Sequence, residues 1–350
     1  MKNNQSHDQS SDPFKIITED VHETILQHLS GKDILNACEV SRFWCDLISC
    51  SKLCLDKVSF VFNGKAAKLD CSVLDRNYQH LIVGTGNHFS MHFRKGFGAQ
   101  KIDKMIELME VFSGSLRTIE VKTLLKNEYR ARFEGTLTKL ERLGIMCLNQ
   151  TLLKMLSSTI PNLKTLEIGS TILTHSELID FLAQFQTLES LSIMFNILDR
   201  MFADGVSDRL KFKLRSLTIE KTFNGRTESD ENFEKFLIAQ TETLKEMHFI
   251  NIAHAPTINV IFDELTVETL TINFVDEPLQ LNPKPNTFIT NLIVKNEDNC
   301  VALLKASPNL KKFHIQKITR PSIIFLATEM KFLTTVSYNE KEDEFRDGPM

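Results

Sequence analysis

Apolar residues recur along most of the chain in a six-residue pattern, apolar-x-x-apolar-x-apolar, which appears ten times between residues 115 and 338. Two weaker copies, LDKVSF (55–60) and YQHLIV (78–83), extend the pattern towards the N-terminus. The first apolar residues of the ten copies lie 21 to 30 residues apart: Leu116, Leu140, Leu163, Leu188, Leu214, Leu244, Val267, Ile289, Leu310 and Leu333. Such a near-constant period predicts a stack of similar units that bury one continuous core.

Each unit is expected to form one short strand and one returning segment. The return is predicted to be helical where apolar residues lie three and four apart, as in residues 152–161, 177–186, 231–240 and 300–308. Pro161 and Pro308 stand just before the next strand, where proline ends a helix without removing a hydrogen-bond donor from the sheet. The longest interval holds the polar insertion 221–232, which we expect to be an exposed loop.

Strand geometry predicts that the third and fifth residues of each unit point away from the core. Small hydroxyl residues dominate these positions, with neither an aromatic column nor a basic stripe, which argues against nucleic-acid binding. Two pairs have binding character and are candidate contacts for a protein substrate: Glu246 with His248, and Lys312 with His314. A solvated strand face is the competing interpretation of both pairs.

Residues 14–54 have a different, helical periodicity. Thr18 is a candidate N-cap, Gly31 fits just after a helix, and Asp33 can cap the next helix. The apolar residues fall into two stripes: Val21, Ile25, Leu26 and Leu29, then Val40, Phe43, Trp44, Leu47 and Ile48. The sequence therefore predicts a small helical domain in front of the repeats.

Composition narrows the class of protein. The net charge of −4 gives no electrostatic reason to expect nucleic-acid binding, and no run of apolar residues is long enough for a transmembrane helix. The N-terminus does not resemble a signal peptide, and the seven irregularly spaced cysteines suit a reducing compartment, the cytoplasm or the nucleus. Residues 1–13 are expected to be a disordered leader, and residues 339–350 an acidic tail.

No pattern predicts a catalytic site, a metal site or a cofactor. The cysteines of residues 38–54, with His80, His88 and His92, are interpreted as core thiols and not as zinc ligands, because their spacing matches no paired zinc-ligand motif. Gly84-Thr85-Gly86 lacks the third glycine and the lysine of a phosphate loop, and is better interpreted as a turn after a strand.

The repeated pattern over residues 55–338 resembles the leucine-rich repeats. The resemblance implies an α/β horseshoe with a parallel sheet on its concave side. The Asn or Cys that usually follows the strand is missing from most units, and unit lengths vary.

Residues 14–54 resemble the F-box, which binds the Skp-family adaptor of cullin-based ubiquitin ligases. Ile17-Thr18-Glu19 stands where the family has Leu-Pro and an acidic residue, and Val40-Ser41-Arg42-Phe43-Trp44 matches its Val-Cys-Arg/Lys-x-Trp element. The resemblance implies that the adaptor contacts are apolar residues of this segment: Ile17, Val21, Ile25, Leu26, Leu29, Leu35, Val40 and Trp44.

An F-box followed by leucine-rich repeats implies a non-catalytic substrate receptor of a Skp-cullin-F-box ubiquitin ligase. The expected partners are the adaptor, through it a cullin, and a protein substrate that is marked for proteasomal degradation. Neither a nucleic acid nor a membrane is expected as a partner. The alternative is a protein-interaction scaffold without a ligase role, in which a degenerate F-box only covers the apolar end of the repeats.

Overall fold

The computed structural model of the chain contains two compact units, Met1–Leu140 and Glu141–Met350. The structure describes residues 18–55, 57–64, 71, 78–84, 96–126, 133–156, 159–194, 209–220, 231–250, 255–273, 283–295, 300–316 and 318–338. The expected leader, the expected acidic tail and residues 221–230 of the polar insertion lie outside these ranges.

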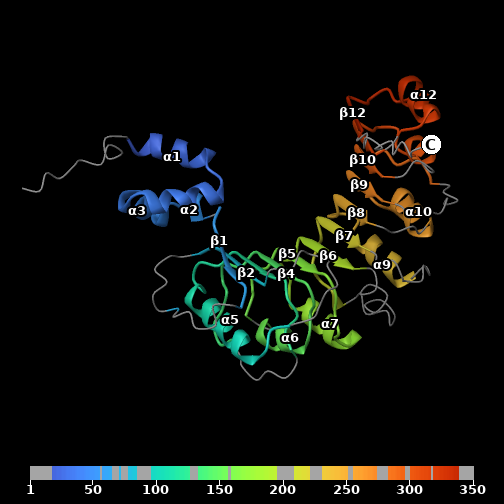
Figure 1. The fold of residues 1–350 in the computed structure, drawn as a ribbon. Helices are drawn as coiled ribbons and strands as arrows, with labels where there is room; N and C mark the ends of the chain where they lie inside the picture. Colours follow the sequence, from blue (N-terminus) through green and yellow to red (C-terminus); the bar gives the residue numbers. More distant parts are fainter. Residues whose placement is uncertain are drawn as a thin grey trace, which may run out of the picture. The chain divides into compact units, whose positions relative to one another are not determined.

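The first unit begins with four short helices and continues into a parallel sheet (Figure 1). The helices are α1 (Glu19–His28), α2 (Gly31–Val40), α3 (Arg42–Cys50) and α4 (Lys52–Leu55). The strands β1 (Ser59–Phe62), β2 (His80–Val83) and β3 (Thr118–Val121) pair in chain order, and α5 (Ala99–Val111) lies between β2 and β3 in the sequence. The predicted helical segment is thus present ahead of the first strand.

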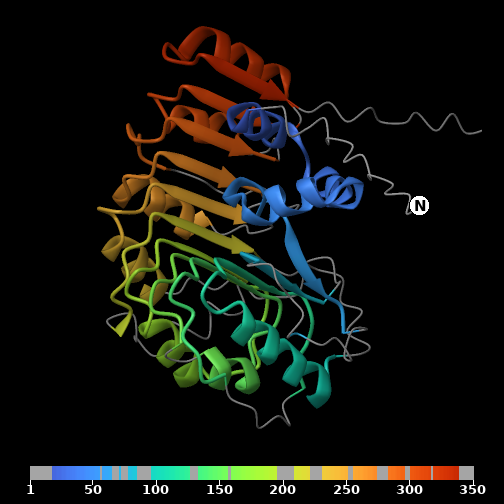
Figure 2. The same ribbon diagram turned by 90° about the vertical axis from the view of Figure 1, so that its left-hand side faces the viewer.

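The second unit is a nine-strand sheet in which every strand is parallel to its neighbour and the order follows the chain (Figure 2). Its strands are β4 (Arg142–Ile145), β5 (Thr165–Ile168), β6 (Ser190–Met194), β7 (Ser216–Glu220), β8 (Glu246–Ile250), β9 (Thr269–Ile272), β10 (Asn291–Val294), β11 (Lys312–Ile315) and β12 (Thr335–Tyr338). One face is covered by the helices α6 (Gln150–Leu156), α7 (His175–Ala183), α9 (Glu231–Ala239), α10 (Ala255–Glu264), α11 (Cys300–Lys305) and α12 (Arg320–Glu329) (Figure 1). We call the opposite face the open face.

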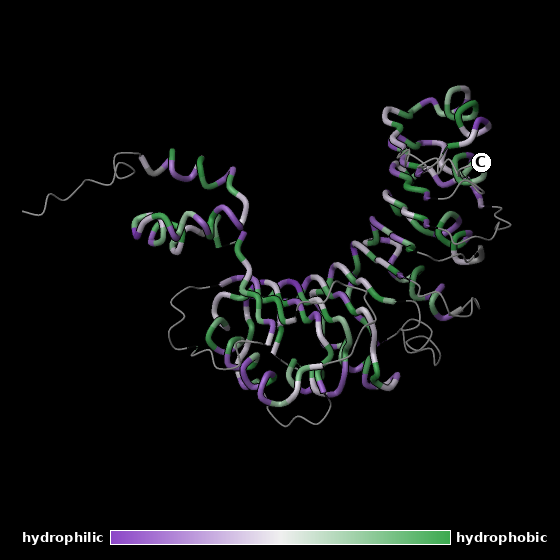
Figure 3. The backbone as a smooth tube through the Cα atoms, viewed as in Figure 1, coloured by the Kyte–Doolittle hydropathy of each residue, from purple (hydrophilic) through white to green (hydrophobic). Residues whose placement is uncertain are grey.

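Burial follows the repeated pattern. In the unit of β5, Leu163, Leu166 and Ile168 are buried, whereas Thr165 and Glu167 lie on the open face and are partly exposed. Hydrophobic and hydrophilic residues alternate along the strands in Figure 3. The strands predicted from the ten copies are all present, and helices occupy the four predicted returns.

The first weak copy was assigned the wrong register. The copy spans residues 55–60 and puts Val58 and Phe60 at apolar positions, but β1 spans Ser59–Phe62 and its buried side chain is Phe62. Val58 packs into the helical core of the first unit, while Phe62 is buried beside Phe97 with ring centroids 5.6 Å apart. Because Val58 belongs to the helical core, the strand begins after it.

The last copy departs from the pattern in its burial. Val336 and Tyr338 occupy apolar positions of β12 but are exposed, as are Ile323 and Ile324 on α12. β12 is the final strand of the sheet and pairs only with β11 among the described residues. Within the part of the chain that the structure describes, no further strand packs beside these side chains.

A buried asparagine joins neighbouring units of the sheet. The Asn286 side-chain nitrogen lies 3.4, 3.1 and 2.8 Å from the carbonyl oxygens of Ile261, Phe262 and Leu265, at the end of α10. Its side-chain oxygen accepts from the Phe288 N–H at 2.9 Å. The amide therefore supplies a donor to carbonyls at the end of α10, of which that of Ile261 also accepts from the Leu265 N–H at 3.2 Å.

Substituting Asn286→Ala should lower the free energy of unfolding by about 2–4 kcal/mol, since buried backbone groups lose their partner. Chemical denaturation followed by circular dichroism measures the loss. Asn309→Ala is the matched control, because that amide donates to the Thr287 carbonyl at an exposed position. The control should cost less than about 1 kcal/mol. Equal losses in the two variants would contradict this account of Asn286.

Candidate functional site

The turn between α1 and α2 is fixed by a capping box. Ser30 Oγ accepts from the Asp33 N–H at 3.2 Å, and Asp33 Oδ2 accepts from the Ser30 N–H at 3.2 Å. The hydrogen bond from Ser30 Oγ holds the pKa of the Asp33 carboxyl below its usual value. Asp33 does stabilise the start of this helix, but Ser30 is the N-cap and Gly31 is the first residue of α2. Gly31 does lie just past the end of α1, as expected, but it is not among the glycines with positive φ and therefore does not act as a left-handed cap.

The Lys57 side chain caps the C-terminal end of α1. Its ammonium nitrogen lies 3.0, 2.7 and 3.0 Å from the carbonyl oxygens of Leu26, Gln27 and Leu29, where α1 ends. Gly31 permits this arrangement, because a Cβ at that position would lie 2.4 Å from the Lys57 carbonyl oxygen. Neither role is predictable from the local sequence, since the contacts join residues about 30 positions apart.

Trp44 is the centre of an aromatic cluster. Its backbone N–H donates to Ser41 Oγ at 3.3 Å, which makes Ser41 the cap of α3 at the position where the F-box pattern usually has cysteine. The Trp44 ring lies 5.5 Å from the ring of His22 and 6.1 Å from that of Phe43. Edge-on aromatic packing of this kind stabilises beyond the area that it buries.

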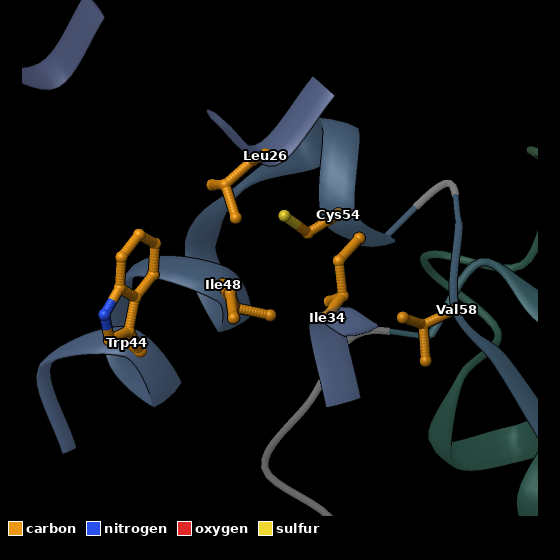
Figure 4. Packing of buried hydrophobic residues seen from close by; sticks show 6 residues of the cluster. All are labelled: Leu26, Ile34, Trp44, Ile48, Cys54 and Val58. Carbon is orange, nitrogen blue, oxygen red and sulfur yellow. The ribbon is translucent and has the colours of Figure 1, made fainter. Parts of the chain in front are cut away.

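The four helices enclose one small core, whose side chains converge in Figure 4. Its buried members are Leu26, Ile34, Trp44, Ile48, Cys54 and Val58. Burial raises the pKa of the Cys54 thiol, which keeps this cysteine in its neutral form. Two of the predicted adaptor contacts, Leu26 and Trp44, therefore lie in the core, and Leu29 packs against it.

Other predicted contacts lie on the surface of α1 and α2. The exposed fractions are 46% for Val21, 36% for Ile25, 43% for Leu35 and 71% for Val40. We call these four side chains the apolar helix surface. Val21 and Ile25 are one helical turn apart, so they lie on the same face of α1. Ile17 lies outside the described residues.

The candidate substrate contacts lie on the open face, as the pattern predicts, but on separate strands. Glu246 and His248 are on β8 and Lys312 and His314 are on β11, with β9 and β10 between them. His248 Nδ1 lies 2.8 Å from Thr271 Oγ1, and His314 Nδ1 lies 2.8 Å from Ser337 Oγ. The structure therefore does not join the two pairs into one cluster.

His248 is half-buried between Thr218 and Thr271 of the adjoining strands. Burial lowers the pKa of its imidazole, and the Glu246 carboxylate opposes the shift. The neutral form is therefore favoured in the folded protein.

Comparison with known protein families supports the assignment of the helical segment. Residues 16–56 match the F-box domain. The chain carries an F-box. These residues span α1 to α4, so the F-box is the domain that bears the apolar helix surface. No curated protein matches the chain.

F-box domains bind Skp-family adaptors in cullin-based ligases, and F-box proteins are generally non-catalytic subunits of those complexes. Within the part of the chain that the structure describes, no helix is long and apolar enough to cross a membrane. No group of three or more His, Cys, Asp or Glu side chains among the described residues is placed to hold a metal ion.

Lys57→Met should lower the free energy of unfolding of the F-box by about 1.5–3 kcal/mol, because three carbonyls lose a charged donor. Trp44 is the only tryptophan and is buried, so its fluorescence during urea denaturation reports on this domain. Lys32→Met, at an exposed position of α2, is the control and should have little effect. A variant as stable as the parent would contradict the capping role.

His248 should make the second unit less stable in acid. Its pKa is lowered in the folded protein, so between that value and the ordinary 6.5 the unfolded chain binds more protons. Stability is then fully present above pH 6.5 and falls as the pH drops below it. Urea midpoints at pH 7.5 and 5.5 should differ less for His248→Gln than for the parent. The same difference in both proteins would show that His248 is not responsible.

Proposed function

We propose that this protein is the substrate-recognition subunit of a Skp-cullin-F-box ubiquitin ligase. The F-box, residues 14–54, binds the Skp-family adaptor and through it a cullin. Residues 55–338 form leucine-rich repeats in a horseshoe and bind a protein substrate for ubiquitin-dependent degradation. The subunit is non-catalytic and acts in the cytoplasm or nucleus. Exposure of the apolar helix surface on a domain that matches the F-box supports this proposal.

The apolar helix surface can contribute substantially to binding. Complete burial of a Val, Leu or Ile side chain contributes roughly 1.5–3 kcal/mol, and these four are already about half covered. Their burial against an apolar groove would therefore contribute on the order of 3–6 kcal/mol before the costs of association. Exposed apolar side chains at the surface of a small helical domain can mark an interaction site.

The separation of buried from exposed apolar side chains in the F-box also supports adaptor binding. Leu26 and Trp44 hold the helices together, so we assign them to folding and not to direct contact. Val21, Ile25, Leu35 and Val40 are free to be covered by a partner without any loss of the core. A domain built this way presents its binding side chains on a rigid support, which reduces the entropy lost on binding.

A receptor of this kind works by proximity. It holds a substrate lysine near the ubiquitin-conjugating enzyme of the assembly, which turns an encounter in solution into an effectively intramolecular one. Effective concentrations can then reach the millimolar range. The parallel sheet supplies a continuous surface on which a substrate can be held in one orientation.

The adaptor interaction can be tested by pull-down with a purified Skp-family adaptor. Ile25→Arg and Leu35→Arg should each weaken binding at least about tenfold, because a guanidinium would be buried without a partner. Ile238→Arg on α9 is the matched control, since Ile238 is similarly exposed but lies in the second unit. The control should bind like the parent.

Circular dichroism and Trp44 fluorescence would establish that the variants are folded. A parent protein that does not bind the adaptor would rule out the ligase role and leave the alternative, a repeat scaffold with a degenerate F-box.

Thr18 stands at the position of the family's proline. It is the N-cap residue of α1, but its side chain makes no capping hydrogen bond. Thr18→Pro should therefore leave the helix intact, because proline is tolerated at a helix start.

A further inference from the structure

In the second unit, several charged side chains on or just before the strands form ion pairs with the adjacent unit. Arg142 pairs with Glu167 at 2.7 Å, and Lys164 pairs with Glu141 at 3.3 Å. Further along, Lys245 pairs with Glu268 at 3.2 Å. Each pair joins a basic side chain on or just before β4, β5 or β8 to a carboxylate of the adjacent unit.

The basic side chains at β11 are not paired with carboxylates in this way. Lys311 and Lys312 are exposed, and neither forms an ion pair within the residues that the structure describes. The segments 290–294, 311–315 and 334–338, which carry β10, β11 and β12, contain no aspartate or glutamate. The carboxylate of Glu268, on the segment leading into β9, is engaged by Lys245. We call Lys311, Lys312 and His314 the lysine patch.

The register of the sheet determines which residues lie beside the lysine patch. Lys312 lies opposite Asn291 of β10 and Thr335 of β12 in the sheet register. The Lys311 N–H donates to the Thr290 carbonyl at 2.8 Å, and its carbonyl accepts from the Thr334 N–H at 2.8 Å. The two lysines are therefore framed by neutral hydrogen-bonding residues on both sides.

Some of these neighbouring groups are available to a ligand. Thr334 Oγ1 donates to the Lys311 carbonyl at 3.0 Å, and His314 is bonded to Ser337, so those groups are used within the fold. The side chains of Asn291 and Thr335 make no hydrogen bond within the described part of the chain. Two ammonium groups with a free amide and a free hydroxyl beside them form a surface that suits carboxylates.

We propose that the lysine patch binds an acidic peptide segment of the protein substrate. The inference rests on the proposed function, because it names the chemistry of the substrate that the repeats take. In an extended peptide, side chains on the same face are roughly 6.6 Å apart, a spacing that two flexible lysine side chains span. Asn291 and Thr335 donate to the remaining carboxylate or carbonyl oxygens of the peptide.

A nucleic acid does not fit this surface. At the register positions of Lys312 and His314, the neighbouring residues Asn291, Ile293, Thr335 and Ser337 include no phenylalanine, tyrosine or tryptophan on which a base could stack. The protein as a whole is acidic, with a net charge of −4, which opposes binding to a polyanionic backbone. A short acidic segment needs only the local charge of the patch.

Fluorescence anisotropy with the full-length protein tests the proposal. The probe is a labelled ten-residue peptide of alternating glutamate and serine, and the comparison peptide carries glutamine in place of glutamate. We expect the acidic peptide to bind and the glutamine peptide to bind at least about tenfold more weakly, because only carboxylates pair with the ammonium groups. Raising the salt concentration should weaken binding of the acidic peptide.

The double variant Lys311→Glu/Lys312→Glu should weaken binding of the acidic peptide by at least about tenfold, since two attractions become repulsions. Lys211→Glu/Lys235→Glu carries the same change in net charge at exposed positions away from β10–β12, and should bind like the parent. Lys312→Gln, which keeps a long polar side chain, should weaken binding about threefold and provides a second variant if the double variant fails to fold.

Equal binding of the two peptides, or unchanged binding by the lysine variants, would overturn the proposal. A dimer of the parent that the double variant abolishes would assign the patch to a second copy of this chain and would also overturn it. Adaptor pull-down with the same variants separates the two proposals. Peptide binding that fails while the adaptor still binds counts against this inference alone, whereas a parent that fails to bind the adaptor counts against the ligase role.

Discussion

The structure depends on one packing constraint, which is that no repeated unit buries its apolar side chains alone. Leu166 of β5 is paired in register with Leu143 of β4 and Leu191 of β6, and all three are fully buried. Each strand thus completes the core of its neighbours, and the helices cover the same row from one side. The alternation of side chains along a strand then leaves the third and fifth residues on the open face. Polar residues are free to vary there without any effect on the core, which is what a binding surface requires.

The F-box buries its apolar side chains without the help of repeated neighbours. It is too small to rely on repetition, so it encloses a handful of apolar side chains and fixes the helix ends with polar contacts. Ser30, Ser41 and Lys57 satisfy backbone groups that would otherwise be unpaired. The helices are thereby held rigidly enough to keep Val21 and Ile25 on the surface. A less firmly held domain would collapse around those side chains and no longer expose them.

Sequence periodicity predicted most of the architecture, because both the strand pattern and the helical stripes are local. It placed Leu163, Leu166 and Ile168 in the core correctly. It could not separate Leu26, which is buried, from Ile25, which is exposed, since adjacent residues on one apolar stripe differ only through the helices packed against them. The register of β1 failed for a similar reason, as Val58 packs with residues far away in sequence. Lys57 carried no local signal at all. The candidate surfaces were therefore located by sequence, while their individual contacts required the fold.

The contacts of Lys57 and Val58 show that the physical F-box extends beyond its recognisable motif. The family match ends at residue 56, yet Lys57 closes α1 and Val58 fills the core. Both residues come immediately before β1, so the same short segment completes one domain and begins the sheet. A fragment ending at the motif boundary would lose a helix cap and a core side chain together. The boundary between the F-box and the sheet is thus a shared element, and exchange of either part between proteins must carry these two residues with it.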